Sequence, residues 1–170
     1  MNNNFNPIGF IGTGLMGVCF IKRLSEVNYL INAYDKRQEK LELLKGEDKV
    51  SLSINPAQVS KNCDIIFICV DKTENVKDVV FGDNGIIQNA SENTIIVDLS
   101  TTLANETINF SKKIKLEKGS SWVDAPISGG PEKALDGSLA IMVGGEQKDI
   151  DIISPILNDI SSNFTHFGSV

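Results

Sequence analysis

The feature that most constrains the fold is an alternation, along the whole chain, of short apolar runs with segments whose apolar residues recur at helical spacing. The first apolar run, 8–11, ends at a glycine, and apolar residues then recur every three positions over 15–24. The run 65–70 is apolar at every position, as expected of a parallel strand covered on both faces. The alternation predicts an α/β fold with a doubly wound, mainly parallel sheet and helices on both faces.

The expected elements follow from these patterns. We expect strands at 8–11, 30–34, 50–52, 65–70, 94–99, 122–127, 139–143 and 164–167. We expect helices at 15–24, 37–45, 105–114 and 149–160, one that begins at Asn55-Pro56 and one through Val76 to Val80. No repeat or linker divides the chain, so residues 8–168 are expected to form one domain. The asparagine-rich residues 1–7 are expected to be a disordered lead.

Composition excludes several classes of function. The 16 Lys and Arg residues are outnumbered by 22 Asp and Glu residues, which argues against nucleic-acid or anionic-membrane binding. Three cysteines (Cys19, Cys63 and Cys69) and a single histidine (His166) offer no zinc-ligand spacing, so we expect no metal and three free thiols. No apolar run approaches the ~20 residues of a membrane span, and no signal peptide is recognisable. We therefore expect a soluble, cytoplasmic protein.

A glycine pattern follows the first apolar run. Its six residues are Gly12, Thr13, Gly14, Leu15, Met16 and Gly17. In a strand–turn–helix context, the first glycine makes the turn, the second lets a pyrophosphate approach, and the third lets the helix pack closely. Asp35 follows the next expected strand, eighteen residues after Gly17, where an acid binds the adenosine ribose. The pattern predicts a dinucleotide site.

The choice between NAD and NADP depends on charge. Asp35 would accept hydrogen bonds from the ribose hydroxyls and repel a 2′-phosphate, which favours NAD. Lys36 and Arg37 follow directly and would pair with a 2′-phosphate if they face it, which keeps NADP as the alternative. A third interpretation is that both are solvated charges at a helix start.

A second candidate site is the segment 124–130, in which an expected strand ends in a serine and two glycines. Backbone amides and a hydroxyl in such a loop converge on an anion, for example a carboxylate. The loop also follows the carboxyl end of a strand, which is the usual ligand edge of these sheets. Ser128, Gly129 and Gly130 are therefore candidate substrate-binding residues, with a plain flexible loop as the alternative.

These motifs together resemble the β-hydroxyacid dehydrogenases, a family that includes 3-hydroxyisobutyrate dehydrogenase and tartronate semialdehyde reductase, with 6-phosphogluconate dehydrogenase as a relative. The resemblance extends from about Ile8 to Gly168. It is carried by four segments in the family's order, which are 8–17, 81–86, 97–101 and 124–145. It implies a Rossmann-like domain that binds NAD, or NADP, and a short carboxylate substrate.

The resemblance also implies roles for single residues. Val70, Asp71, Asn75 and Thr101 match positions that line the nicotinamide side, and Lys36 lies with Asp35 on the adenosine side. Asp71 is a departure, because the family usually has proline there. A second departure is Ala104, where proline is also usual.

In the family, a helical domain follows the cofactor domain and carries the catalytic lysine. We therefore expect that lysine beyond Val170, no catalytic residue within this chain, and an exposed apolar surface where the second domain packs. Lys133 in the substrate loop does not match the catalytic position. The intact protein is expected to be a homo-oligomeric dehydrogenase, and this chain to be inactive alone. The alternatives are a non-catalytic nicotinamide-cofactor-binding module and an imine or other reductase on the same scaffold.

Overall fold

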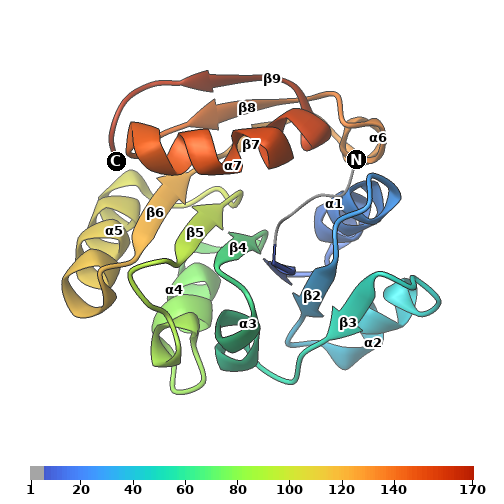
Figure 1. Cartoon of the computed structure of the whole chain (residues 1–170), viewed down its shortest axis with the longest axis horizontal. Helices are drawn as coiled ribbons and strands as arrows, with labels where there is room; N and C mark the ends of the chain where they lie inside the picture. The colour runs from blue at the N-terminus through green and yellow to red at the C-terminus, as the bar shows by residue number, and fades with distance from the viewer. Residues whose placement is uncertain (1–5) are drawn as a thin grey trace.

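The computed structural model describes residues 6–170, and its centre is a parallel six-stranded sheet (Figure 1). The strand order is β3-β2-β1-β4-β5-β6, in which the chain starts in the middle and builds outward in both directions. The strands are β1 (Ile8–Ile11), β2 (Ile31–Tyr34), β3 (Val50–Leu52), β4 (Ile65–Ile68), β5 (Ile95–Asp98) and β6 (Ser121–Asp124). All five pairings are parallel. The predicted Rossmann-like fold class is confirmed.

Helices cover both faces of this sheet, and the central strands β1, β4 and β5 are therefore buried at every position. One face carries α3 (Pro56–Asn62), α4 (Thr73–Phe81), the 3-10 turn η2 (Ile86–Gln88) and α5 (Ala104–Lys118), with a core around Ile66, Ile96 and Trp122. The other face carries α1 (Leu15–Glu26), with a core around Phe10 and Phe67. The helix α2 (Gln38–Leu41) and the turn η1 (Glu42–Leu44) lie beyond β2.

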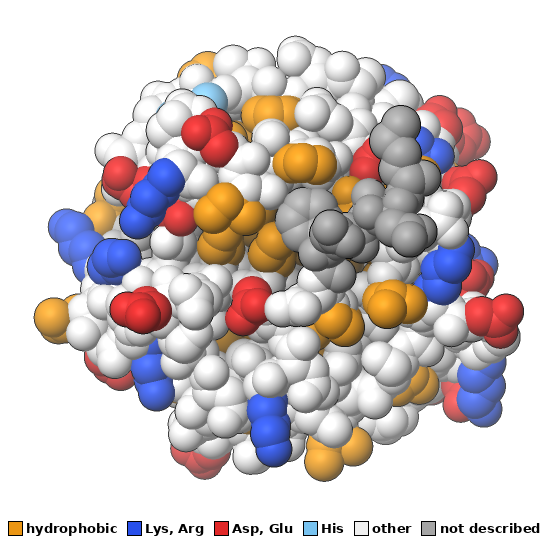
Figure 2. Space-filling model, in the orientation of Figure 1, with side chains coloured by type: hydrophobic (Ala, Val, Ile, Leu, Met, Phe, Trp, Pro, Cys, Tyr) orange, Lys and Arg blue, Asp and Glu red, His pale blue; other side chains and the backbone are white. Residues whose placement is uncertain are grey.

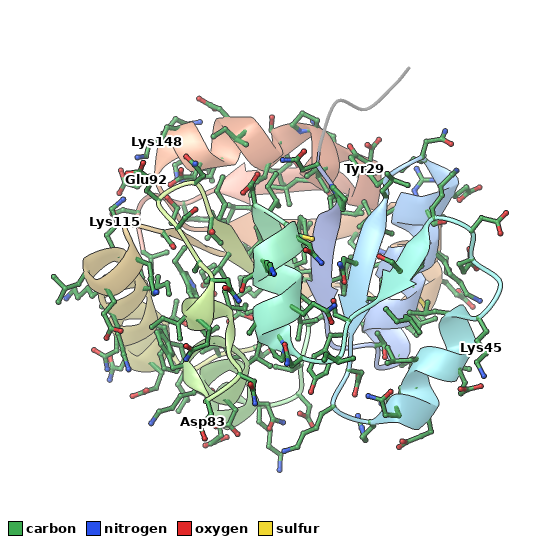
Figure 3. The ribbon with its side chains drawn as sticks, turned by 60° about the horizontal axis from the view of Figure 1, so that its bottom comes forward. Tyr29, Lys45, Asp83, Glu92, Lys115 and Lys148 are labelled. Atoms are coloured by element: carbon green, nitrogen blue, oxygen red, sulfur yellow. The ribbon has the colours of Figure 1, made fainter. Side chains whose placement is uncertain are left out.

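The chain leaves the main sheet after β6 and builds a second, smaller sheet. Its strands are β7 (Ile127–Ser128), β8 (Leu139–Val143) and β9 (Ser161–His166), and its helices are α6 (Pro131–Asp136) and α7 (Gln147–Ile160). β7 pairs antiparallel and β9 parallel with β8. In Figure 1 this sheet and α7 lie along one side of the six-stranded sheet, together with α1. Tyr29, before β2, donates its hydroxyl to Asp159 of α7 at 2.8 Å, and Figure 3 shows Tyr29 beside that helix.

The expected strand 122–127 is therefore two strands in two sheets. The last hydrogen bond of this segment to the six-stranded sheet is donated by the Ala125 amide to the Asp98 carbonyl, at 2.8 Å. Pro126 has no amide hydrogen and cannot continue the ladder. The Met142 amide then donates to the Pro126 carbonyl at 3.1 Å, which starts the pairing of the second sheet. A bridge between Asp124 and Gly144 connects the two sheets.

Other predicted elements are present with shifted ends. The predicted helix 105–114 continues to Lys118 and ends where Gly119 takes a φ of +72°. The predicted helix 37–45 is only one helical turn followed by η1. Asn55 caps α3, accepting the Gln58 amide at 2.8 Å, as the Asn-Pro pair predicts. Most of the expected disordered lead, residues 1–5, lies outside the described residues.

None of the helices within residues 6–170 could span a membrane. In Figure 2, hydrophobic side chains gather in the middle of the visible face, while charged side chains lie mostly toward its edges. Leu15 and Leu103 are 74% and 65% exposed; Leu15 is the first residue of α1, and Leu103 is the last residue of the loop after β5. The protein therefore presents apolar side chains close to its candidate site.

Candidate functional site

The candidate site lies where the carboxyl ends of the parallel strands meet. The glycine turn follows β1, Asp35 follows β2, Val70 follows β4 and Thr101 follows β5. The strand order reverses between β1 and β4, and in open α/β sheets ligands bind in the crevice at that point. The topology therefore brings together residues that are up to 89 positions apart in the chain.

The glycine turn has the shape that its sequence predicts. Gly12 has a φ of +99°, and a Cβ there would lie 2.2 Å from the Cys69 carbonyl oxygen. A Cβ at Gly17 would lie 1.9 Å from the Gly12 carbonyl oxygen, so α1 packs directly on the turn. At Gly14, in contrast, a Cβ would meet only Lys40 Nζ, at 3.6 Å. Two of the glycines are thus required by packing, and the middle one faces open space.

The start of α1 offers unpaired amides to a ligand. Gly14 occupies the N-cap position and supplies no side-chain cap, and the first turn of α1 contains no acidic residue. The first amides of a helix have no partner within it and attract anions. The turn, the open position and these amides together fit a bound pyrophosphate.

Asp35 is not a free acceptor, because its carboxylate is bound to the glycine turn. Oδ2 accepts the Thr13 amide at 2.7 Å and the Thr13 hydroxyl at 3.2 Å, and Oδ1 accepts the Arg37 amide at 2.9 Å. Asp35 is 7% exposed and Thr13 is fully buried. Sequence reasoning placed both residues in the site but did not foresee that they bind each other.

Three cationic residues follow Asp35 in the chain, and Arg37 lies close to its carboxylate. Arg37 Nε lies 3.9 Å from Asp35 Oδ1, and Lys36 is exposed beside it. Lys40 of α2 reaches toward Gly14 and was missed by the sequence analysis. Its signal was available, because Lys40 follows Arg37 by three residues at the start of an expected helix. The adenosine side of the site is therefore mixed in charge.

Three of the four residues expected on the nicotinamide side, Val70, Asp71 and Thr101, lie in the loops after β4 and β5, and the fourth, Asn75, lies in the first turn of α4. Asp71 and Asn75 contact each other, with Asn75 Nδ2 donating to Asp71 Oδ1 at 2.6 Å. That hydrogen bond is the main cause that lowers the pKa of Asp71. The Val70 amide donates to Ser100 Oγ at 3.0 Å, and Thr101 is exposed next to it. The structure thus brings the two loops together.

Two acids end neighbouring strands at this edge of the sheet, and the sequence analysis did not single them out as a group; Asp98 is fully buried and Asp124 is half-buried. Asp98 and Asp124 end β5 and β6 and are register partners. Burial raises the pKa of Asp98, and burial together with Asp98 raises the pKa of Asp124 to about 6. Burial and Asp98 also raise the pKa of the Cys69 thiol to about 12, so that thiol is protonated at neutral pH.

The expected substrate loop lies on the second sheet. Ser128, Gly129 and Gly130 are all exposed. Gly129 has a φ of +135°, and a Cβ there would lie 2.6 Å from Leu139 Cδ2, whereas a Cβ at Gly130 would meet nothing within 4 Å. The following helix, α6, packs against α1, the helix that starts at the glycine turn. The loop is thereby attached to the same helix as the glycine turn.

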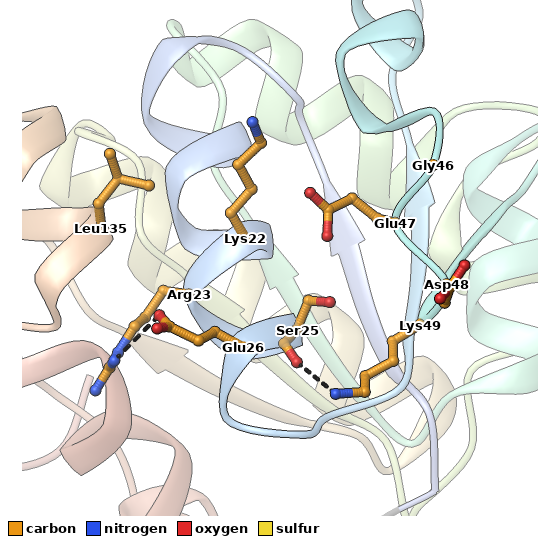
Figure 4. A pocket seen from close by; sticks show the side chains of 9 residues that line it. All are labelled: Lys22, Arg23, Ser25, Glu26, Gly46, Glu47, Asp48, Lys49 and Leu135. Atoms are coloured by element: carbon orange, nitrogen blue, oxygen red, sulfur yellow. Dashed lines mark hydrogen bonds and ion pairs between the residues drawn. The ribbon is translucent and has the colours of Figure 1, made fainter.

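A cavity away from these loops is lined mainly by polar and charged side chains. It has a volume of about 460 Å³ and is lined by residues of α1, by the connection before β3 and by Leu135 of α6 (Figure 4). Its polar groups contact each other: Arg23 pairs with Glu26 at 3.5 Å, and Lys49 donates to the Ser25 carbonyl at 3.0 Å. Because α1 ends and β3 begins there, the cavity is at the amino edge of the sheet, opposite the glycine turn.

Metal ligands are not gathered anywhere in the part of the chain that the structure describes, where no three His, Cys, Asp or Glu side chains are placed to share an ion. His166 makes structural contacts instead. Its Nε2 lies 3.0 Å from the Gly145 carbonyl oxygen and 2.9 Å from that of Gly168. The histidine therefore links residues 166–168 to the loop that precedes α7.

Comparison with known families gives a match over residues 7–168 to the NAD-binding domain of 6-phosphogluconate dehydrogenase. The chain belongs to this family. Among curated relatives, 2-hydroxy-3-oxopropionate reductase of Escherichia coli is 34% identical over 162 residues, which cover 95% of this chain and 54% of the reductase. An uncharacterised oxidoreductase of Bacillus subtilis, YkwC, is 35% identical over 95% of this chain and 55% of its own length. These relatives agree with the predicted β-hydroxyacid dehydrogenase resemblance.

Solved structures show the same fold. The structure titled Psf3 in complex with NADP+ and 2-OPP superposes with a TM-score of 0.89 at 25% identity and covers 95% of this chain and 56% of that one. The 3-hydroxyisobutyrate dehydrogenase of Mycobacterium tuberculosis, solved with L-serine, has a TM-score of 0.89 at 21% identity and covers 98% and 55%. The chain spans about half the length of each of these four relatives.

Proposed function

We propose that this domain binds the nicotinamide cofactor of an oxidoreductase that transfers a hydride to or from a short β-hydroxy acid. The observation that carries the proposal is the glycine turn: Gly12 and Gly17 have no room for a side chain, and Gly14 opens onto free helix amides. The substrate class, of the 3-hydroxyisobutyrate or 2-hydroxy-3-oxopropionate type, is supported by the similarity to the E. coli reductase.

Each part of the site has a distinct role in this proposal. The bound nicotinamide supplies or accepts the hydride. The amides after Gly14 bind the pyrophosphate, while Val70, Asp71, Asn75 and Thr101 surround the nicotinamide. The loop Ser128–Gly130 binds the substrate carboxylate through its amides and hydroxyl. The proton of the substrate hydroxyl passes to a lysine outside residues 1–170.

We further propose that the cofactor is NAD. The Asp35 carboxylate repels a 2′-phosphate, and the lone pair of Oδ1 that remains beside the Arg37 amide accepts a ribose hydroxyl while Oδ2 holds Thr13. Lys36, Arg37 and Lys40 are the groups that would favour NADP. Arg37 lies 3.9 Å from Asp35 and is partly neutralised there, which weakens its attraction for a phosphate.

Fluorescence titration with NADH and with NADPH tests the proposal on this chain. We expect saturable NADH binding that is at least several-fold tighter than NADPH binding, and weaker NADH binding in Asp35→Ala. Tighter NADPH binding, lost in a variant that combines Arg37→Ala with Lys40→Ala, would overturn the choice of NAD. Absence of binding by either cofactor would overturn the proposed function.

A non-catalytic cofactor-binding module is the second candidate. The observation that favours it is the similarity to human N-PAC, named a cytokine-like nuclear factor, which is 32% identical over 86% of this chain and 27% of its own length. Turnover separates the candidates. A longer protein that includes a second domain is expected to reduce NAD with a short β-hydroxy acid, and a protein that binds NADH without any turnover would favour the module.

A further inference from the structure

The loops that follow β4 and β5 hold each other through side-chain hydroxyls. The Val70 amide, from the first loop, donates to Ser100 Oγ of the second at 3.0 Å. The Leu103 amide, from the second loop, donates to Thr73 Oγ1 at the start of α4 at 3.1 Å. Each loop thus satisfies a backbone amide of the other, and the pair is joined at two points.

Asp98 holds the second loop from below. It is the last residue of β5 and is fully buried. Its Oδ1 accepts the Ser100 amide at 3.0 Å, and its Oδ2 accepts the Thr102 hydroxyl at 2.8 Å. No cation pairs with this carboxylate within residues 6–170, so hydrogen bonds are what compensate its burial.

Ser100 connects the two sets of contacts. Its amide binds Asp98 and its hydroxyl binds the Val70 amide, and the residue is 4% exposed. Thr101, which follows it, is exposed and lies between two residues that Asp98 holds. The network therefore sets the position of Val70 relative to Thr101 without either side chain taking part in it.

We propose that Asp98 and Ser100 are positioning residues that hold Val70 and Thr101 in the arrangement that receives the nicotinamide ring. The inference rests on the proposed function. A ligand that binds loops already held in place loses less affinity to the ordering of those loops. The adenosine half of the cofactor is bound by different groups, the glycine turn and Asp35, so the network acts on the nicotinamide half alone.

The test compares NADH with ADP-ribose, which lacks the nicotinamide ring, by calorimetric titration of this chain. In Ser100→Ala, which removes the hydroxyl contacts with the Val70 amide and with Asp98, we expect the affinity for NADH to fall about fivefold to tenfold and the affinity for ADP-ribose to stay unchanged. Thr102→Val keeps the side-chain shape and removes only the outer hydrogen bond to Asp98. Thr102→Val should also lower the affinity for NADH, by a smaller factor than Ser100→Ala does.

Ser60→Ala is the matched control. Ser60 lies on α3, away from the site, and is also buried, with 6% of its surface exposed. Its hydroxyl donates to the Ile86 carbonyl at 2.9 Å. It should lose comparable stability and keep the ratio of NADH to ADP-ribose affinity.

Three results would contradict the inference. The first is a ratio of NADH to ADP-ribose affinity that is unchanged in both Ser100→Ala and Thr102→Val. The second is an equal fall in the affinities for the two ligands. The third is a parent protein that binds NADH no better than ADP-ribose. A parent protein that binds neither ligand would overturn the proposed function itself, so the two failures are distinguishable.

Discussion

The glycine turn after β1 and the loop Ser128–Gly130 both connect a strand to a helix through glycines, yet their surroundings differ. In the turn, any side chain at Gly12 or Gly17 would overlap backbone atoms. In the loop, all three residues are exposed; a Cβ at Gly129 would meet the end of the Leu139 side chain, but a Cβ at Gly130 would meet nothing within 4 Å. The comparison teaches that packing against the fold determines the shape of the turn, whereas the loop keeps a face that a ligand is free to use.

Gly17→Ala should have the largest effect. Its Cβ would stand 1.9 Å from the Gly12 carbonyl oxygen, so α1 would have to move away from the sheet. We expect the free energy of unfolding to fall by more than about 3 kcal/mol, measured by urea denaturation. Gly130→Ala is the matched control and should change it by less than about 0.5 kcal/mol. Similar losses in both variants would abolish the distinction between the two regions.

Asp35→Ala should come second. The substitution removes the acceptor of the Thr13 amide, the Thr13 hydroxyl and the Arg37 amide, and leaves a buried amide without a partner. We expect a loss of about 2 kcal/mol in the free energy of unfolding. Asp71→Ala, at an exposed carboxylate, should cost less than about 0.5 kcal/mol and serves as the control. A loss in Asp35→Ala no greater than in its control would contradict the structural role of this carboxylate.

Asp124→Asn should stabilise the protein at neutral pH. Burial and Asp98 raise the folded pKa of Asp124 to about 6, above the unfolded value. The folded state therefore holds the proton more tightly, and stability falls as pH rises from about 4 to about 6. Since the group is partly exposed, we expect the asparagine variant to gain only about 1 kcal/mol at pH 7 and nothing at pH 4. Thermal melts across this range check the sign, and a loss at pH 7 would contradict it.

Ser128→Ala should have the smallest effect on folding. The side chain is exposed in the loop before α6, so its removal should change the free energy of unfolding by less than about 0.5 kcal/mol. Any functional effect should appear only in a protein that also carries a second domain, as a higher KM for the hydroxy acid. A loss of more than about 1 kcal/mol in this chain would show that the Ser128 side chain takes part in the packing of this loop.

The sequence predicted the parts of the molecule that local sterics determine. The buried strands follow from apolar runs such as Ile65–Ile68, and the glycine turn follows from three glycines between a strand and a helix. The break after β6 was also encoded locally, in a proline that cannot donate to a ladder. The expected strand 122–127 nevertheless ran through Pro126, because its neighbours are apolar on both sides.

Contacts between distant residues were not predictable in the same way. The bond between Asp35 and Thr13 joins residues 22 positions apart, and that between Val70 and Ser100 joins residues 30 apart. Both depend on which strands are neighbours and on how far each strand extends. The residue types, an acid after one strand and a serine after another, indicate polar ends of strands but not their partners.

The backbone bridge between Asp124 and Gly144 lies at the boundary between the two sheets. Within residues 6–170, it is the backbone pairing that connects the six-stranded sheet to the three-stranded one. The loop that carries Ser128 therefore belongs to a ladder of its own, and an insertion or deletion there leaves the register of β1 through β6 unaltered. Sequence variation in this loop is therefore structurally separate from the pairing of the six-stranded sheet.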